Sequence, residues 1–403
     1  MKPTGPIPPE FNAPGTLTVG GRTGEDWVAE HGTPLFVYDA AIVAARISAL
    51  RTALPPAVEI HFAIKANPYP PLLAAVAPLV GGLDVASAGE LAKALAVKSA
   101  EHISFAGPGK RDVELEAAIR AGATINLESE GEATRALAIG DRLGIVPRLA
   151  VRVNPSFELK GSGMKMGGRP SPFGIDADRV PALVRRIIDA GADWRGFHIF
   201  AGSQALDTAA IIETQAATVA LASDLAARAG AVPPLVNLGG GLGVPYFAND
   251  TAVDVAAIGA ALGEVLVPGQ HYAIELGRWL VAESGVYLTR VVDRKDSGGE
   301  TFLVIDGGLH HQLAATGNFG TVVRRNYPVA LARAVGAEPD ETVSIVGPLC
   351  TPLDRLSDRI GFPRADVGDV IAIFLAGAYG PTASPAGFLG HPPAVEFLTG
   401  TAV

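Results

Sequence analysis

The 403-residue sequence contains little cysteine, little charge and no long uninterrupted hydrophobic run. Its single cysteine, Cys350, excludes a disulfide framework within the chain and a cysteine-based zinc site, and it fits a reducing compartment. No run reaches the roughly 18 apolar residues of a membrane span, and the N-terminal residues lack the apolar core of a signal peptide. We therefore expect a cytoplasmic protein with no membrane partner.

Positive charge is also scarce. The 32 basic and 41 acidic residues give a net charge of −9, which offers no electrostatic attraction to nucleic acid. Hydrophobic residues make up 48% and charged residues 18%, a balance that excludes a disordered chain. The 48 glycines and 31 prolines follow no collagen period and predict many tight turns. We expect a small-molecule ligand and no metal site.

Short apolar runs alternate with Ala- and Leu-rich helical stretches between residues 58 and 278, which is typical of βα units and a parallel sheet. The runs are VEIHFAIKA (58–66), LDVAS (83–87), ISFAG (103–107), ATINLES (123–129), RLAVRVNP (148–155), WRGFHIFAG (194–202), PLVNLGGG (234–241) and YAIELGR (272–278). Eight such units predict a (β/α)8 barrel. A doubly wound open sheet is the alternative that periodicity alone leaves open.

Polar residues favour the barrel, because barrel enzymes place their chemistry at the carboxyl ends of the strands. The polar residues and glycines at or near the ends of these runs are Lys65, Asp84, Glu128, Arg152, His198, Gly239, Gly240, Gly241, Glu275 and Arg278. Charges scattered over a protein surface would not fall regularly at the ends of the apolar runs.

After residue 286 the sequence pattern changes to strand-like runs separated by Gly, Pro and Asp. The N-terminal residues to about 40 are too short to fold alone. We therefore predict an α/β protein with an N-terminal segment (1–40) that joins the β domain, a TIM-type (β/α)8 barrel (41–285) and a C-terminal mostly-β domain (286–403).

Lys65 ends an otherwise apolar strand, where desolvation would lower its pKa and favour imine formation with an aldehyde. The alternative is a lysine that keeps its charge in water at the barrel rim. The glycines of Asn237–Gly243 would let backbone N–H groups approach a phosphate, and barrels often bind phosphate after strands 7 and 8. A simple tight turn is the alternative there.

Glu275 and His198 suit a pyridine-type cofactor. A carboxylate at Glu275 could keep a pyridine nitrogen protonated, and His198 could stack on a flat ring. The alternatives are a surface ion pair between Glu275 and Arg278, and a core histidine with satisfied hydrogen bonds.

The motifs HFAIKANP, LDVASAGEL, VRVNP, GFHIFAGSQ, NLGGGLG, ELGR, GPLCTPLD and GAYG, in this order, resemble the fold-type III pyridoxal-phosphate decarboxylases. This is the family of diaminopimelate and ornithine/arginine decarboxylases. The resemblance covers roughly residues 35 to 395 and implies a cofactor-binding barrel with a β domain.

The resemblance implies a set of residues that bind pyridoxal 5'-phosphate. They are Lys65, Asp84, Arg152, His198, Ser203, Gly240, Gly241, Glu275, Gly277, Arg278 and Tyr379. Lys65 would form the imine with the cofactor, His198 would stack on its ring, and Glu275 would pair with the ring nitrogen. The phosphate would lie against Ser203, the glycines and Arg278.

Cys350 matches the family's catalytic cysteine, which enters the site from the partner subunit of a homodimer and protonates the carbanion after carbon dioxide leaves; Asp354 lies in the same loop. Glu275 and Cys350 favour decarboxylation over racemisation in the same cofactor class. A non-catalytic cofactor-binding relative would be expected to lack Lys65 or Cys350, and both are present.

The substrate loop departs from the two main branches of the family. Diaminopimelate decarboxylases carry C-E-S-G-D and ornithine decarboxylases C-D-G-L-D, whereas this chain has Thr351 after the cysteine and lacks the R-P-x-L-Y segment. The loop is similar to the secondary-metabolism branch that includes the carrier-linked glutamate decarboxylase of butirosin assembly and the exosortase-associated decarboxylases. We expect a substrate without a free distal ammonium, free or tethered to a carrier protein, with Arg324 or Arg325 as candidate contacts for an anionic distal group. A meso-diaminopimelate decarboxylase is the alternative.

Overall fold

The computed structural model describes residues 1–158, 162–165, 170–317 and 325–401. These residues form two compact units, which we call the barrel unit and the β unit. The barrel unit comprises Arg46–Gly243 and Val253–Gly277, and the β unit comprises Met1–Ala45, Val244–Ala252 and Arg278–Val403. That the chain divides into domains after residues 40 and 285 stays a prediction.

Eight parallel strands close into a barrel within the part of the chain that the structure describes, as predicted, so the open sheet is wrong. The strands, in barrel order, are β4 (Val58–Ala63), β5 (Gly82–Val85), β6 (Ile103–Phe105), β7 (Thr124–Leu127), β8 (Arg148–Asn154), β11 (Asp193–Ile199), β13 (Leu235–Asn237) and β14 (Tyr272–Leu276). Pairing of β14 with β4 and of β7 with β8 completes the ring.

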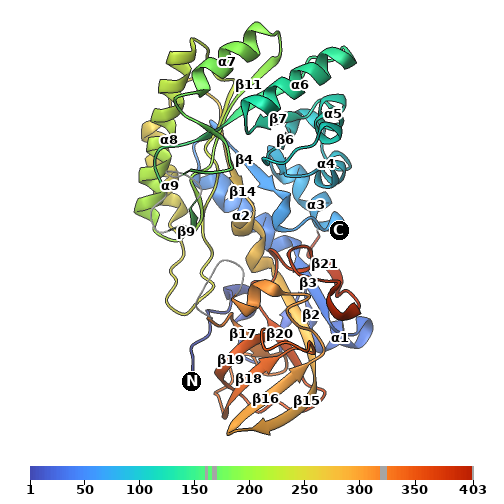
Figure 1. The fold of residues 1–403 in the computed structure, drawn as a ribbon. Helices are drawn as coiled ribbons and strands as arrows, with labels where there is room; N and C mark the ends of the chain where they lie inside the picture. Colours follow the sequence, from blue (N-terminus) through green and yellow to red (C-terminus); the bar gives the residue numbers. More distant parts are fainter. Residues whose placement is uncertain (159–161, 166–169, 318–324, 402–403) are drawn as a thin grey trace. The chain divides into compact units, whose positions relative to one another are not determined.

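Helices follow the barrel strands along the chain and lie outside them (Figure 1). They are α3 (Pro70–Val76), α4 (Ala88–Leu95), α5 (Asp112–Ala121), α6 (Glu130–Leu143), α7 (Val180–Asp189), α8 (Thr208–Ala229) and α9 (Val255–Val265). Serine caps fix two helix starts directly after strands: the Ser87 hydroxyl accepts from Glu90 N, and the Ser129 hydroxyl accepts from Glu132 N. Every residue of β5 and β14 is buried, as expected for strands covered on both faces.

Short elements join the barrel strands. A two-stranded antiparallel sheet pairs β9 (Ser162–Lys165) with β12 (Gly202–Ala205), and β10 (Ile175–Asp176) extends beside β8. One-turn 3-10 helices are η2 (Ile64–Ala66), η3 (Ala77–Leu79) and η4 (Ala100–His102). The first of these places Lys65 just beyond the carboxyl end of β4.

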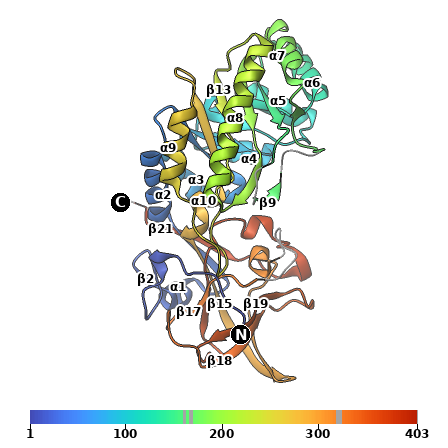
Figure 2. The same cartoon turned by 90° about the vertical axis from the view of Figure 1, so that its left-hand side faces the viewer.

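The β unit contains a mixed sheet around a long central strand (Figure 2). Its strands are β3 (Leu35–Asp39), β15 (Gly285–Ser297), β16 (Glu300–Ile305), β17 (Val329–Leu331), β18 (Glu341–Val346), β19 (Arg355–Phe362), β20 (Val370–Ile373) and β21 (Val395–Thr399). The N-terminal strand β3 pairs with β15 and β21, which confirms that the N-terminal segment joins the β domain.

The remaining elements belong to the β unit, except that the helix Ala40–Ala53 continues into the barrel unit. They are η1 (Pro9–Phe11), β1 (Thr18–Val19), β2 (Arg22–Thr23), α1 (Gly24–His31), α2 (Ala40–Ala53), α10 (Arg278–Val281), η5 (Ala282–Ser284), η6 (Leu313–Thr316), η7 (Pro381–Ala383) and η8 (Phe388–Gly390). Among the described residues, no helix is long and apolar enough to cross a membrane.

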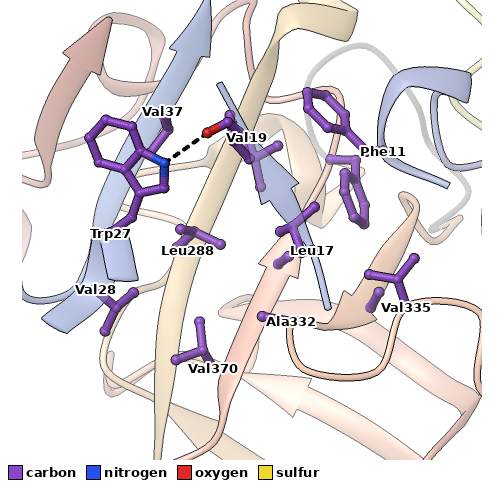
Figure 3. Close-up of a cluster of buried hydrophobic side chains, with 14 of the residues drawn as sticks. Phe11, Leu17, Val19, Trp27, Val28, Val37, Leu288, Ala332, Val335 and Val370 are labelled. Carbon is purple, nitrogen blue, oxygen red and sulfur yellow. Dashed lines mark hydrogen bonds between the residues drawn. The ribbon is translucent and has the colours of Figure 1, made fainter. Parts of the chain in front are cut away.

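A hydrophobic cluster binds the N-terminal segment to the central sheet of the β unit (Figure 3). Leu17 and Val19 pack with Leu288 of β15 and Val370 of β20. Trp27 of α1 joins them, and its indole N–H donates to Val19 O at 3.0 Å, which satisfies the one polar atom of a buried ring. Burial of this apolar surface stabilises the N-terminal segment against the sheet.

Candidate active site

Three predicted residues meet at the carboxyl end of the barrel: His198 of β11, Glu275 of β14, and Lys65 of η2, which follows β4. Lys65 Nζ lies 3.2 Å from Glu275 Oε1, and His198 Nε2 lies 2.9 Å from Glu275 Oε2. Glu275 and His198 are buried, whereas 47% of the Lys65 side chain is exposed. The lysine side chain is therefore accessible to an incoming carbonyl compound, while the acid and the imidazole are held inside.

Electrostatics keep Glu275 ionised. Burial raises the pKa of its carboxyl, but the Lys65 ammonium and the His198 hydrogen bond lower it by more, so the net pKa lies well below its usual range. An ionised carboxylate only accepts hydrogen bonds, so His198 Nε2 is the donor. His198 Nδ1 is buried and has no hydrogen-bond partner among the described residues.

The glycine-rich segment after β13 approaches its neighbours too closely for any side chain. A Cβ on Gly240 would lie 1.8 Å from Glu275 O, and one on Gly239 would lie 2.5 Å from Ile199 O. Gly239 also has φ +70°, a conformation that favours glycine. The backbone is thus bare beside Glu275, as a phosphate-binding loop requires. Gly241 follows in the same segment, and Gly277 comes directly after β14.

Arg152, a predicted cofactor contact, is held by the carboxylate of Glu128, which also lies at a strand end. Arg152 Nη1 donates to Glu128 Oε1 at 2.8 Å. The same carboxylate accepts from Gly107 N at 2.6 Å and from Gly174 N at 2.7 Å. Arg152 also contributes to the low pKa of Glu275, so its charge reaches the Lys65 cluster.

Two other predicted residues of the barrel unit lie apart from these contacts. Asp84 is buried in β5, and its Oδ2 lies 3.5 Å from His61 Nδ1. Ser203 lies in β12, half-buried, opposite β9. Sequence reasoning missed Glu90, whose carboxylate accepts a hydrogen bond from Ala86 N at 2.7 Å. Burial raises the pKa of Glu90 above its usual range, and the Ala86 hydrogen bond and the Lys65 charge offset part of that rise. Its place at the start of a helix after β5 was the available signal.

A buried ion pair, also missed from sequence, supports the barrel mouth. Lys110 Nζ and Glu132 Oε1 are 2.7 Å apart, and each side chain is 1% exposed. We expect Lys110→Met to lower the free energy of unfolding by about 3–5 kcal/mol, because it leaves a buried carboxylate without its partner. Arg120→Met, which removes an exposed partner of Glu116, is the control and should change stability little. Urea denaturation of both variants measures this, and equal stabilities would contradict it.

In the β unit, Arg278 and Tyr379 lie together. The Arg278 guanidinium is 4.5 Å from the centre of the Tyr379 ring, and its Nη1 donates to Tyr246 Oη at 3.1 Å. Burial lowers the pKa of Arg278, but the nearby tyrosine hydroxyls raise it by more, and Tyr246 contributes most. The net pKa therefore lies above its usual range. Tyr246 and Tyr327, whose rings are 4.7 Å apart, were not predicted from sequence.

The predicted cysteine loop also belongs to the β unit. Cys350 is exposed, and Thr351 after it is partly exposed. Asp354 is buried, and its carboxylate accepts from Leu309 N at 2.6 Å and from Leu349 N at 2.9 Å.

The two candidate arginines differ in what the structure says of them. The Arg325 guanidinium lies 3.7 Å from the centre of the Phe247 ring, and Arg325 Nη1 is 3.7 Å from Asp250 Oδ1. Arg324 lies outside the described residues.

The residues of the barrel unit fit pyridoxal phosphate. This cofactor requires an amine, an anion at its ring nitrogen and a site for its phosphate. The half-exposed Lys65 side chain, an ionised carboxylate, a buried imidazole with one unpartnered nitrogen and a bare glycine loop provide these groups. The described residues contain no group of His, Cys, Asp and Glu side chains that could hold a metal ion.

Comparison with known proteins identifies the family. Residues 40–289 match the family profile of the pyridoxal-dependent decarboxylases, pyridoxal binding domain. This chain therefore belongs to the pyridoxal-dependent decarboxylases, and its cofactor is pyridoxal phosphate.

Several characterised proteins are similar over nearly the whole chain. The L-glutamyl-[BtrI acyl-carrier protein] decarboxylase of Niallia circulans is 37% identical and covers 91% of this chain and 88% of its own. The 2-[(L-alanin-3-ylcarbamoyl)methyl]-2-hydroxybutanedioate decarboxylase of Staphylococcus aureus is 31% identical, with 91% and 94% coverage. Diaminopimelate decarboxylase from Helicobacter pylori, solved with L-lysine, superposes with a TM-score of 0.84 at 26% identity and 93% coverage of both chains. The protein is a pyridoxal-phosphate-dependent amino-acid decarboxylase.

Proposed function

We propose that this enzyme removes the α-carboxylate of an amino acid whose distal end carries no free ammonium, such as a glutamyl unit presented by a carrier protein. The observation that carries the proposal is the loop after Cys350, which offers no free carboxylate. The similarity to the Niallia circulans enzyme, whose name specifies a carrier-bound glutamyl substrate, supports it.

Two positions of this loop bear on the distal end of the substrate. Thr351 is neutral where the diaminopimelate and ornithine enzymes have an acid. Asp354 is buried and both of its oxygens accept backbone hydrogen bonds, so this carboxylate shapes the loop from within. A distal ammonium buried here would lack a counter-ion, which costs several kcal/mol.

Residues of the barrel unit divide the catalytic work. When bound, pyridoxal phosphate supplies an electron sink for the negative charge that loss of carbon dioxide leaves behind. Lys65 binds the cofactor covalently through its amine. Glu275 holds a proton at the pyridine nitrogen, and His198 orients Glu275 and packs against the ring.

Phosphate binding and proton return complete the proposed roles. The bare backbone at Gly240 and Gly241, with Ser203, Gly277 and Arg278, holds the phosphate, while Asp84, Arg152 and Tyr379 are further cofactor contacts. Cys350 donates the proton that replaces the lost carboxylate. It acts on the site of the partner subunit in a homodimer, so each site is composite.

The substrate proposal predicts a specific order of rates. We expect kcat/KM for carbon dioxide release to be at least about tenfold higher with carrier-bound L-glutamate than with ornithine, lysine or meso-diaminopimelate. The reason is that each 1.4 kcal/mol of the cost of an unpaired ammonium lowers kcat/KM by a factor of about ten. Thr351→Glu should shift preference toward the diamino acids, and Thr351→Gln is the matched neutral control.

One result would overturn this order. Rapid decarboxylation of meso-diaminopimelate by the unmodified enzyme would place it with the diaminopimelate decarboxylases. Racemisation without carbon dioxide release, measured by chiral chromatography, would favour the racemase alternative.

A further inference from the structure

Arg278 carries a positive charge that no carboxylate of the described residues neutralises. Within the described part of the chain, the contacts of its guanidinium are with tyrosines, and no acid pairs with it. Its Nε atom is buried and has no hydrogen-bond partner among the described residues. A desolvated cation without a counter-ion is costly, so this position suits an anion that comes from outside the chain.

One hydrogen bond sets the orientation of this guanidinium. Arg278 Nη1 donates to Tyr246 Oη at 3.1 Å, and Arg278 Cζ lies 4.5 Å from the centre of the Tyr379 ring. Attraction between a cation and a ring depends mainly on the distance to the ring centre, so the Tyr379 contact alone would let the guanidinium turn. The hydrogen bond is directional, and Tyr246 therefore fixes which way the remaining N–H groups point.

Tyr246 is itself held firmly, with 3% of the residue exposed. Its ring lies 4.7 Å from the Tyr327 ring. Its backbone N–H donates to Asp250 Oδ2 at 3.1 Å, and the same oxygen accepts from Phe247 N at 3.1 Å. A Cβ on Gly5 would lie 2.0 Å from Tyr246 O, so the N-terminal segment passes close against this backbone. The hydroxyl is therefore in place before any ligand arrives.

Packing alone does not account for the hydroxyl of Tyr246. Contact with the Tyr327 ring needs only an aromatic ring, which phenylalanine would also supply. Burying a hydroxyl costs free energy unless it is hydrogen-bonded, and this one accepts from Arg278. Arg278 directly follows Gly277, and both are phosphate contacts under the proposed function.

We propose that Tyr246 is a positioning residue for the cofactor, whose hydroxyl holds the Arg278 guanidinium ready for the phosphate of pyridoxal phosphate. The inference rests on the phosphate-binding role of Arg278 under the proposed function. Because Tyr246 acts through Arg278, its contribution should require the phosphate group of the ligand and should vanish when Arg278 is replaced.

Binding of two forms of the cofactor separates this role from a structural one. The full-length protein is freed of cofactor with hydroxylamine and titrated with pyridoxal phosphate or with pyridoxal, which lacks the phosphate, and the change in absorbance is followed. Tyr246→Phe should weaken binding of pyridoxal phosphate by about tenfold and change binding of pyridoxal by less than about twofold, because only the phosphate meets Arg278. Tyr246→Leu replaces Tyr246→Phe if the latter does not fold.

Tyr272→Phe is the matched control, because it removes another buried tyrosine hydroxyl. Tyr272 Oη accepts from Val267 N at 3.1 Å and contributes nothing to the Arg278 contacts. This variant should leave the ratio of the two dissociation constants, for pyridoxal and for pyridoxal phosphate, as it is in the unmodified protein.

A double variant tests whether Tyr246 acts through Arg278. Arg278→Gln should weaken binding of pyridoxal phosphate at least as much as Tyr246→Phe, and adding Tyr246→Phe to it should cause no further loss. An unchanged affinity in Tyr246→Phe, an equal loss for both ligands, or a further tenfold loss in the double variant overturns the proposal. If Arg278→Gln itself leaves the affinity for pyridoxal phosphate unchanged, the proposed role of Arg278 fails too; if Arg278→Gln weakens binding and Tyr246→Phe does not, this inference fails alone.

Discussion

Lys65→Ala should lower the rate of carbon dioxide release by at least about a thousandfold, because covalent attachment of the cofactor is lost. The Lys65 side chain is about half exposed and its amine lies beside the Glu275 carboxylate, the position a bound carbonyl compound would need. Borohydride reduction of the wild-type holoenzyme followed by peptide mapping should place the cofactor label on Lys65.

Lys93→Ala is the matched control for this experiment. Lys93 lies in α4, is exposed and donates a long hydrogen bond of 3.5 Å to Pro68 O. Its removal should leave activity and labelling unchanged. A label on another lysine would show that the assignment of Lys65 is wrong.

Mixing two inactive variants should restore activity if the sites are composite. Lys65→Ala and Cys350→Ala subunits that exchange freely would form hybrids with one intact site, giving about a quarter of wild-type activity. The exposed position of Cys350 on its own chain motivates this experiment. Activity is measured by carbon dioxide release after subunit exchange.

The control mixture contains Lys65→Ala and the Lys65→Ala, Cys350→Ala double variant, in which no hybrid carries an intact site. It should remain inactive. Failure of the first mixture to regain activity, with exchange demonstrated by mass spectrometry, would instead indicate a site built within one chain.

The barrel could be predicted because strands buried on both faces are almost continuously apolar, and all eight runs became barrel strands. The meeting of Lys65, His198 and Glu275 followed from their common phase at strand ends. Local pattern contains no comparable signal for pairing between distant segments. This is why the pairing of β21 with β3 and the placement of Val244–Ala252 in the β unit emerged only from the structure.

The same limit applies to buried polar pairs. Lys110 and Glu132 are 22 residues apart, and each reads as an ordinary surface charge in the sequence. Their burial depends on how the loop after β6 and helix α6 pack together. Residue type at the strand ends therefore predicted that Lys65, His198 and Glu275 would lie together, and it did not predict the buried ion pair of Lys110 and Glu132.

Glu128 has a consequence for the dynamics of the barrel mouth. Its carboxylate joins the loop at Gly107, the loop at Gly174 and the Arg152 side chain through three hydrogen bonds. Because one group holds all three, these segments should open as one cooperative unit rather than separately. The amide hydrogens of Gly107 and Gly174, 67 residues apart in sequence, would then exchange with solvent at matched rates.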